Sequence, residues 1–119
     1  MLNRKAIGQL GEDLAQKYLK NKSFLVIMRN FRVRGGEIDL VCQKSGRIHF
    51  IEVKTRTNLV FGYGEESVNY FKRQRLKTAV LEYLSRQNKR CSWQVDVIVI
   101  ELNIAAKKAK VRYYEAVEL

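Results

Sequence analysis

Gly35-Gly36-Glu37-Ile38-Asp39-Leu40-Val41 and Phe50-Ile51-Glu52-Val53-Lys54-Thr55-Arg56 are the two stretches that decide the fold of this chain. Both are rich in β-branched residues and place apolar side chains at every second position, which is typical of strands. Between them lies Gln43-Lys44-Ser45-Gly46-Arg47, a turn signal. The two stretches are therefore predicted to form an antiparallel hairpin.

The register of this hairpin decides which side chains meet. A turn centred on Ser45-Gly46 pairs residues whose numbers sum to 91, which sets Asp39 opposite Glu52. Lys54 lies two residues beyond Glu52 and so points to the same face. A turn displaced by half a residue would instead set Ile38 against Glu52 and throw Asp39 to the other face. In the favoured register, two carboxylates and one lysine form the minimum set for holding Mg²⁺ and activating a water against a phosphodiester.

The composition is that of one small basic domain spanning residues 1–119. Hydrophobic residues make up 46% of the chain, enough for a single core. No apolar run approaches the ~20 residues that span a membrane, and the first residues lack the apolar stretch of a signal peptide. Cys42 and Cys91 have no metal-ligand spacing and are interpreted as reduced thiols. We therefore expect a cytoplasmic protein with no membrane partner.

The charge balance points to nucleic acid as the partner. Twenty-three lysines and arginines against twelve acids give a formal net charge of +11. Such a surface displaces condensed counterions from phosphates, so nucleic acid, most often DNA, is the expected partner. Two alternatives stay open, namely a basic surface without a specific partner and a surface that binds an acidic protein.

The remaining pattern predicts an α/β protein with the element order α-β-β-β-α-β-β. Ile7, Leu10, Leu14 and Tyr18 form an apolar stripe at helical spacing, and Gly8 and Gly11 suggest a close approach of that helix to its neighbour. The predicted helices cover 4–20 and 69–87, the latter with Asn69 as its N-cap, and the predicted strands cover 24–34, 37–43, 47–55, 93–102 and 111–117. The strand 93–102 is almost continuously apolar, as central strands are.

Several chemical readings of the polar residues compete. Lys54 and Arg56 could share the two acids in a purely structural salt-bridge cluster. Glu37 is an auxiliary ligand at best and otherwise a solvated strand end, and Glu12 has the alternative of an ordinary exposed helix position. The chain has one histidine, His49, which faces the other side of its strand and is interpreted as structural, so nucleophilic Ser/His or Cys/His catalysis has little support.

The ordered set of motifs resembles a known family. An acid followed about a dozen residues later by Glu-x-Lys resembles the PD-(D/E)xK nuclease superfamily, which includes restriction endonucleases and archaeal Holliday-junction resolvases. The chain closely resembles the YraN family of small bacterial proteins over nearly its whole length, through Gly11-Glu12, Gly36-Glu37-Ile38-Asp39-Leu40-Val41, Ile51-Glu52-Val53-Lys54-Thr55-Arg56, Lys72, Leu76 and Tyr83-Leu84. Ile38 stands where the superfamily name has proline, a position that varies widely.

The resemblance implies a restriction-endonuclease-like α-β-β-β-α-β core, a mixed central sheet flanked by helices. It implies Asp39 and Glu52 as metal ligands, Lys54 as the catalytic lysine and Glu12 as a further catalytic acid and ligand. The implied activity is Mg²⁺-dependent cleavage of DNA, with Mn²⁺ as an alternative metal and branched structures such as Holliday junctions among the substrates. The alternative is a non-catalytic nucleic-acid-binding module that keeps the nuclease fold.

Basic and amide side chains beside this site are the expected nucleic-acid contacts. They are Arg29, Arg32, Arg34, Arg56, Lys72, Arg73, Gln74 and Arg75. Gln74 is included because the resemblance places a glutamine on a helix near the active site. Cutting a junction uses two active sites, which favours a homodimer.

Overall fold

A five-stranded mixed sheet carries one helix on each face. The computed structural model describes residues 3–57 and 70–119. Its elements follow the chain as α1 (Arg4–Asn21), β1 (Leu25–Val33), β2 (Gly36–Lys44), β3 (Arg47–Thr57), α3 (Tyr70–Ser85), β4 (Ser92–Asn103) and β5 (Lys108–Tyr114). This order confirms the predicted α/β class and is compatible with the α-β-β-β-α-β core of the restriction-endonuclease-like fold.

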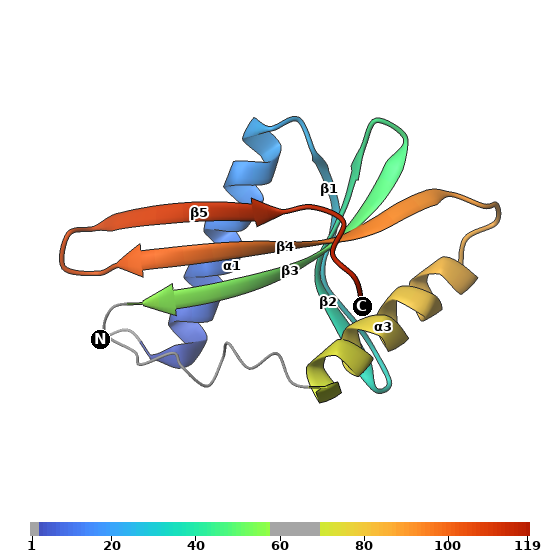
Figure 1. Cartoon of the computed structure of the whole chain (residues 1–119), viewed down its shortest axis with the longest axis horizontal. Helices are drawn as coiled ribbons and strands as arrows, with labels where there is room; N and C mark the ends of the chain where they lie inside the picture. The colour runs from blue at the N-terminus through green and yellow to red at the C-terminus, as the bar shows by residue number, and fades with distance from the viewer. Residues whose placement is uncertain (1–2, 58–69) are drawn as a thin grey trace.

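The strands lie side by side in sequence order, from β1 to β5 (Figure 1). Neighbours are antiparallel except for β3 and β4, which run parallel. A parallel pair needs a crossover connection, and α3 lies within this one. The sheet is strongly twisted, so that the β1–β2 hairpin diverges from the β3–β4–β5 part in Figure 1.

The predicted hairpin register is confirmed. Leu40 pairs with Ile51 and Lys44 pairs with Arg47, and each pair of numbers sums to 91. Ser45 and Gly46 both have positive φ, 52° and 76°, as two-residue hairpin turns that match the twist of their strands require. The turn thus fixes which β3 residue each β2 residue faces.

Alternate residues of β3 pack into two separate cores. Ile51 and Val53 belong to the cluster beneath α1, which also contains Ala15 and Leu19. Ile48 and Phe50 belong to the cluster beneath α3, together with helix residues such as Leu76 and Val80. Successive side chains of a strand point to opposite faces, so the two helices cover opposite sides of the sheet. Glu52 lies two residues after Phe50 and shares the α3 side, and His49 lies two residues before Ile51 and shares the α1 side.

Helix α1 touches the sheet through one of its two predicted contact glycines. Its buried stripe is Ile7, Gly11, Ala15 and Leu19, four residues apart. A Cβ at Gly11 would overlap Thr55 Oγ1 on β3, whereas a Cβ at Gly8 would meet nothing within 4 Å. The predicted close approach is therefore confirmed for Gly11 and wrong for Gly8.

The predicted position of the last strand is wrong. Strand β5 covers Lys108–Tyr114 and not 111–117, because the turn that precedes it closes at Lys107, which has a φ of 53°. Lysines within β5 are compatible with its place at the edge of the sheet. Val117 lies beyond the strand, where its N–H donates to the Val95 carbonyl at 2.8 Å.

The second helix, the cysteines and the absence of an apolar span agree better with the structure. The second predicted helix begins at Tyr70 and ends at Ser85, and the proposed N-cap Asn69 lies outside the described residues. Cys42 and Cys91 are both free thiols, as predicted. Neither described helix has the length and apolarity needed to cross a membrane.

Candidate active site

The regular alternation of β1 and β2 breaks at Asp39. Leu40 packs beneath α1, whereas Ile38, two residues away, packs beneath α3. Their β1 partners behave in the same way, since Arg29 pairs with Leu40 and reaches α1, while Phe31 pairs with Ile38 beneath α3. In a regular strand, residues two apart share a face. Both strands therefore change faces at the same point, and Asp39 lies at that point.

Asn30 supplies the backbone conformation for this change. It lies between Arg29 and Phe31 and has a φ of 55°, in the left-handed region. Asparagine adopts this conformation more readily than other residues with a side chain. One left-handed residue within β1 turns the next side chain to the other face. The hydrogen-bonded ladder between β2 and β3 also ends here, at Leu40 and Ile51.

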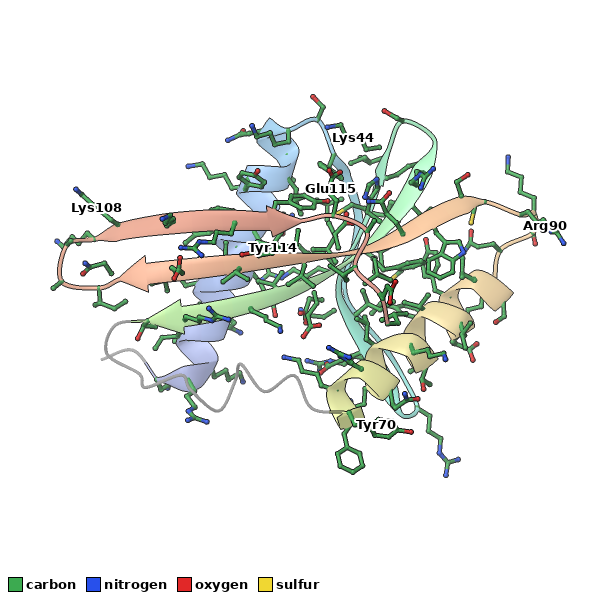
Figure 2. All side chains as sticks on the ribbon, in the orientation of Figure 1. Lys44, Tyr70, Arg90, Lys108, Tyr114 and Glu115 are labelled. Atoms are coloured by element: carbon green, nitrogen blue, oxygen red, sulfur yellow. The ribbon has the colours of Figure 1, made fainter. Side chains whose placement is uncertain are left out.

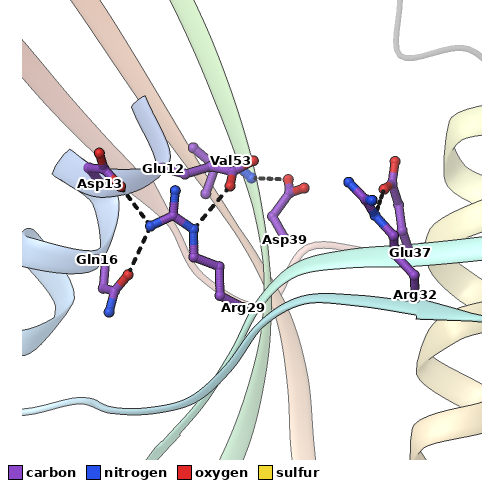
Figure 3. Close-up of polar contacts among 8 residues, drawn as sticks. All are labelled: Glu12, Asp13, Gln16, Arg29, Arg32, Glu37, Asp39 and Val53. Atoms are coloured by element: carbon purple, nitrogen blue, oxygen red, sulfur yellow. Dashed lines mark hydrogen bonds and ion pairs between the residues drawn. The ribbon is translucent and has the colours of Figure 1, made fainter. Parts of the chain in front are cut away.

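The Asp39 carboxylate occupies the place where β2 leaves β3. Its Oδ2 accepts a hydrogen bond from the backbone N–H of Val53 at 2.8 Å (Figure 3). The pKa of Asp39 is raised to about 7, chiefly by burial and also by the negative charges of Glu12 and Glu52, while the Val53 hydrogen bond lowers it. Lys72 lowers it. A carboxyl with this pKa changes its charge close to neutral pH.

Glu52 is a buried acid that lines one cavity together with Asp39. Its side chain is 9% exposed, and its Oε1 lies 3.0 Å from the Lys72 Nζ. Within the described residues this oxygen receives no hydrogen bond of good geometry, so the contact is an ion pair only. A cavity of about 30 Å³ is lined by Glu37, Asp39, Glu52, Lys72, Arg75 and Leu76. That volume suits on the order of one water molecule or ion.

The Lys54 ammonium group interacts with the charges around this cavity, although Lys54 does not line it. It is half-buried on β3, and burial lowers the pKa of its ammonium group. The negative charge of Glu52 raises that pKa, while the cations Lys72, Arg56 and Arg73 lower it. Of the predicted trio, Asp39 and Glu52 therefore line one cavity, and Lys54 interacts with the charge of Glu52 without lining it. The salt-bridge alternative assigned Lys54 and Arg56 to the acids, but within the described residues the ion pair of Glu52 is with Lys72.

Glu12 approaches Asp39 from the α1 side and is held by Arg29. The Arg29 Nε lies 3.3 Å from Glu12 Oε1, and its Nη1 lies 2.6 Å from Asp13 Oδ1 and 3.3 Å from Gln16 Oε1. Figure 3 shows Asp39 between this group and the Arg32–Glu37 ion pair, which has a distance of 3.5 Å. Arg29, predicted as a nucleic-acid contact, is thus committed to three side chains of α1 and fixes where Glu12 points.

The acids fit a divalent cation held by two carboxylates. Within residues 3–57 and 70–119, no three acidic, histidine or cysteine side chains gather closely enough to form a ready-made metal cluster. Mg²⁺ commonly binds through one or two carboxylates and completes its shell with water and substrate phosphate. Asp39 and Glu52 supply that donor set, and the oxygen of Glu52 without a hydrogen bond is available to it. Glu12 lies outside their cavity and is placed to act on Asp39 through its charge.

Two exposed cations of α3, Lys72 and Arg75, line the cavity, and further basic side chains lie on the same strands and helix. Arg32 is largely exposed although it pairs with Glu37, and Arg34 is exposed at the β1–β2 turn. Arg73, Gln74 and Arg75 are exposed on the first turns of α3. Arg56 is half-buried on β3. Arg29, Arg32 and Lys72 form ion pairs with acids of the fold, whereas Arg34, Arg73, Gln74 and Arg75 present exposed side chains to a ligand.

Sequence reasoning missed three features of this region. The Arg29 group and the left-handed Asn30 could not be identified from spacing, although an asparagine within a strand is a weak signal of a special backbone conformation. Tyr70 and Phe71 are 69% and 74% exposed at the start of α3, where apolar burial would be the usual reading. Their exposure next to Lys72 and Arg73 marks them as candidate contacts for bases.

Known proteins match the chain over most of its length. A sequence profile of the uncharacterised protein family UPF0102 matches residues 11–100. A UPF0102 protein of Caldicellulosiruptor saccharolyticus is 35% identical over 104 residues, which are 87% of this chain and 88% of the relative. A UPF0102 protein of Alkaliphilus oremlandii is 39% identical over 112 residues, 93% of this chain and 96% of the relative. The chain therefore belongs to the uncharacterised protein family UPF0102, the YraN family that its motifs resemble.

Proposed function

We propose that this protein is a Mg²⁺-dependent nuclease that hydrolyses phosphodiester bonds in DNA, with Mn²⁺ as an alternative metal. The observation that carries the proposal is the cavity of about 30 Å³ that the half-buried Asp39 and the buried Glu52 line together with the exposed cations Lys72 and Arg75. Two poorly solvated carboxylates with like charge are costly unless one is protonated or a cation joins them. The exposed cations would attract a phosphate toward a metal held by the two acids.

Asp39 and Glu52 would hold the metal, which when bound polarises the phosphate and lowers the pKa of a coordinated water. The Val53 N–H fixes the orientation of Asp39, so that its other carboxylate oxygen is free to act as the ligand. Lys54 would stabilise the negative charge that develops on the phosphate. Glu12, oriented by Arg29, would tune the charge of Asp39.

The partner side of the proposal rests on surface chemistry. The net charge of +11 favours phosphate contacts. Tyr70 and Phe71 are exposed beside Lys72 and Arg73, and exposed aromatic rings stack on bases that are unpaired. These features favour DNA with unpaired regions, and the resemblance to nucleases adds branched structures such as Holliday junctions as candidate substrates. A homodimer in the cytoplasm would bring two sites to such a substrate.

The alternative is a DNA-binding module that kept the fold but does not cleave. Labelled linear, flapped, nicked and four-way DNAs and RNAs, incubated with and without Mg²⁺ or Mn²⁺, distinguish the two. Asp39→Asn should reduce cleavage by orders of magnitude while binding is kept or tightened, because a negative charge near the phosphates is removed. Lys54→Ala should also abolish cleavage, but with weaker binding. Wild-type protein that binds DNA yet binds no divalent metal at millimolar concentration would favour the module.

A further inference from the structure

A second polar cavity lies on the opposite face of the sheet from Glu52. Its volume is about 460 Å³, within the range of small-molecule sites. The residues around it come from the end of α1, the β2–β3 turn, β4 and β5, and they include Lys22, Phe24, Lys44, Arg47, His49 and Glu115. Figure 2 labels Lys44 and Glu115 at this end of the sheet. No residue of the candidate active site lines this cavity.

His49 is held at the base of this cavity by a buried acid. The residue is 6% exposed, and its Nδ1 lies 2.7 Å from Oδ2 of Asp96, which is fully buried on β4. Asp96 also accepts hydrogen bonds from Gln94 Nε2 at 2.8 Å, from the Ala116 N–H at 2.9 Å and from the Tyr113 hydroxyl. These hydrogen bonds outweigh burial and hold the pKa of Asp96 below its ordinary value, so the carboxylate is ionised.

An ionised Asp96 fixes the tautomer of His49. The Nδ1 must carry a proton to donate to the carboxylate, which leaves Nε2 with a lone pair or a second proton. Within the described residues, Nε2 forms no hydrogen bond, and the atom is not fully buried. His49 lines the cavity, so we infer that this nitrogen is the atom it offers to a ligand there. A purely structural histidine would have both nitrogens satisfied or shielded.

The rim of the cavity combines three cations with aromatic walls. The Lys44 Nζ lies 4.8 Å from the centre of the Phe24 ring, and the Lys22 Nζ lies 5.7 Å from that of Tyr18. Arg47 is held by Gln94 Oε1 at 3.3 Å, and Gln94 in turn donates to Asp96. The cations are therefore positioned by neighbours and are not freely mobile. Glu115 is the one acid on the rim.

We propose that this cavity is a binding site for a phosphomonoester, with the phosphate held by Lys22, Lys44, Arg47 and the Nε2 of His49. A phosphate dianion suits a group of cations and accepts a hydrogen bond from Nε2 of a doubly protonated imidazole, whereas a neutral imidazole accepts at Nε2 from the P–OH group of the monoanion. The aromatic walls favour a planar group attached to the phosphate, as in a nucleotide. Two sources carry this chemistry, a free mononucleotide and the 5′-phosphate end of a nucleic-acid strand.

The single histidine of the chain gives a direct measurement. The ring protons of His49 are the only imidazole resonances of the untagged protein, because the sequence contains one histidine. Adenosine 5′-monophosphate, titrated in about 0.15 M salt to suppress diffuse attraction, should shift these resonances to saturation. Inorganic phosphate should shift them more weakly, and adenosine should not shift them. No shift up to millimolar nucleotide, or an equal response to adenosine, would overturn the proposal.

Matched variants separate a built site from general positive charge. Lys44→Gln combined with Arg47→Gln should weaken nucleotide binding by about tenfold or more, because two charge-assisted contacts are lost. Lys107→Gln combined with Lys108→Gln removes the same charge at the β4–β5 turn and should leave the affinity unchanged. If both pairs weaken nucleotide binding equally, the effect is due to net charge alone and the proposed site is rejected. Folding of all variants is checked by the dispersion of their amide spectra.

Oligonucleotides identify the source of the phosphate. One outcome is that a trinucleotide with a 5′-phosphate binds at least as tightly as the mononucleotide and that the same trinucleotide with a 5′-hydroxyl does not bind. This outcome assigns the cavity to the end of a strand. Exclusion of the phosphorylated trinucleotide assigns it to a free nucleotide. Asp39→Asn should bind either ligand normally, so the outcome is independent of the proposed nuclease site on the other face.

Discussion

The Asp39 carboxylate accepts the Val53 backbone N–H at 2.8 Å, at the point where the β2–β3 ladder ends. The hydrogen bond replaces strand pairing by a side-chain contact, which keeps the acid between two diverging strands. It also leaves the carboxylate half-buried near Glu12 and Glu52, where its negative charge is poorly solvated. The same geometry that prepares Asp39 for a metal therefore makes it a source of instability when no metal is bound.

The stability of Asp39→Asn should depend on pH in a defined direction. The carboxyl has a pKa of about 7 in the folded protein, against an unfolded value of about 3.9. The folded state therefore holds its proton more tightly, and the stability this contributes below pH 4 is lost as the pH rises to 7. In a metal chelator, Asp39→Asn should be more stable than wild type by about 2–4 kcal/mol at pH 8 and nearly equal at pH 4. Urea unfolding at both pH values measures this. A less stable variant at pH 8 would show that the ionised acid stabilises the fold.

Lys72→Gln should strengthen metal binding. The Lys72 ammonium lies 3.0 Å from the Glu52 oxygen that a cation would use, so ammonium and metal compete for it. Because the lysine side chain is 53% exposed, solvent screens the interaction, and we expect an affinity gain of about two- to fivefold. Titration calorimetry with Mn²⁺ measures it, with Lys77→Gln on the same helix as the control. Equal affinities for both variants would contradict the competition.

Gly11→Ala and Gly8→Ala form a matched pair within α1. A Cβ at Gly11 would overlap Thr55 Oγ1 and push the helix from β3, so we expect a loss of about 2–3 kcal/mol in unfolding free energy. A Cβ at Gly8 meets nothing within 4 Å, and alanine should add up to about 1 kcal/mol through helix propensity. Thermal or urea unfolding gives both values. Similar effects at the two positions would mean that Gly11 makes no close contact.

Asn30 should tolerate glycine but not valine. Its φ of 55° suits glycine, whereas a β-branched residue there costs roughly 1–2 kcal/mol or forces the strand to straighten. A straightened strand would place Arg29 and Phe31 on one face and release Glu12. Asn30→Gly should therefore keep stability and any cleavage activity, and Asn30→Val should lose both. If valine behaves like glycine, the face change in β1 does not depend on this residue.

Binding of DNA should respond to salt through the α3 cations. Arg73→Ala combined with Arg75→Ala removes two exposed charges and should reduce the slope of log K against log salt by about 2. The loss should be nearly uniform across DNA sequences, since phosphates carry no sequence information. Fluorescence anisotropy over a salt series measures the slope. The pair Lys107→Ala and Lys108→Ala serves as the control. An equal change of the slope in this pair would mean that the phosphate contacts are not concentrated on α3.

The amino-acid sequence by itself determined the hairpin and the identity of its acids. Ser45-Gly46 fixes the turn, and because side chains alternate along a strand, one turn position sets the face of every residue in β3. This local rule placed Glu52 and Lys54 on one side and His49 on the other. The order of helices and strands followed from periodicity in the same way.

Only the tertiary structure decided how the acids are used. The face change at Asn30 and Asp39 depends on both strands packing against two helices at once, and no local pattern encodes it. Arg29 could have met a phosphate, but α1 brings three polar side chains to it. Likewise His49 acquires its orientation from Asp96, which is 47 residues away in sequence. Spacing along a chain determines local direction, whereas burial and charge depend on which distant elements come into contact.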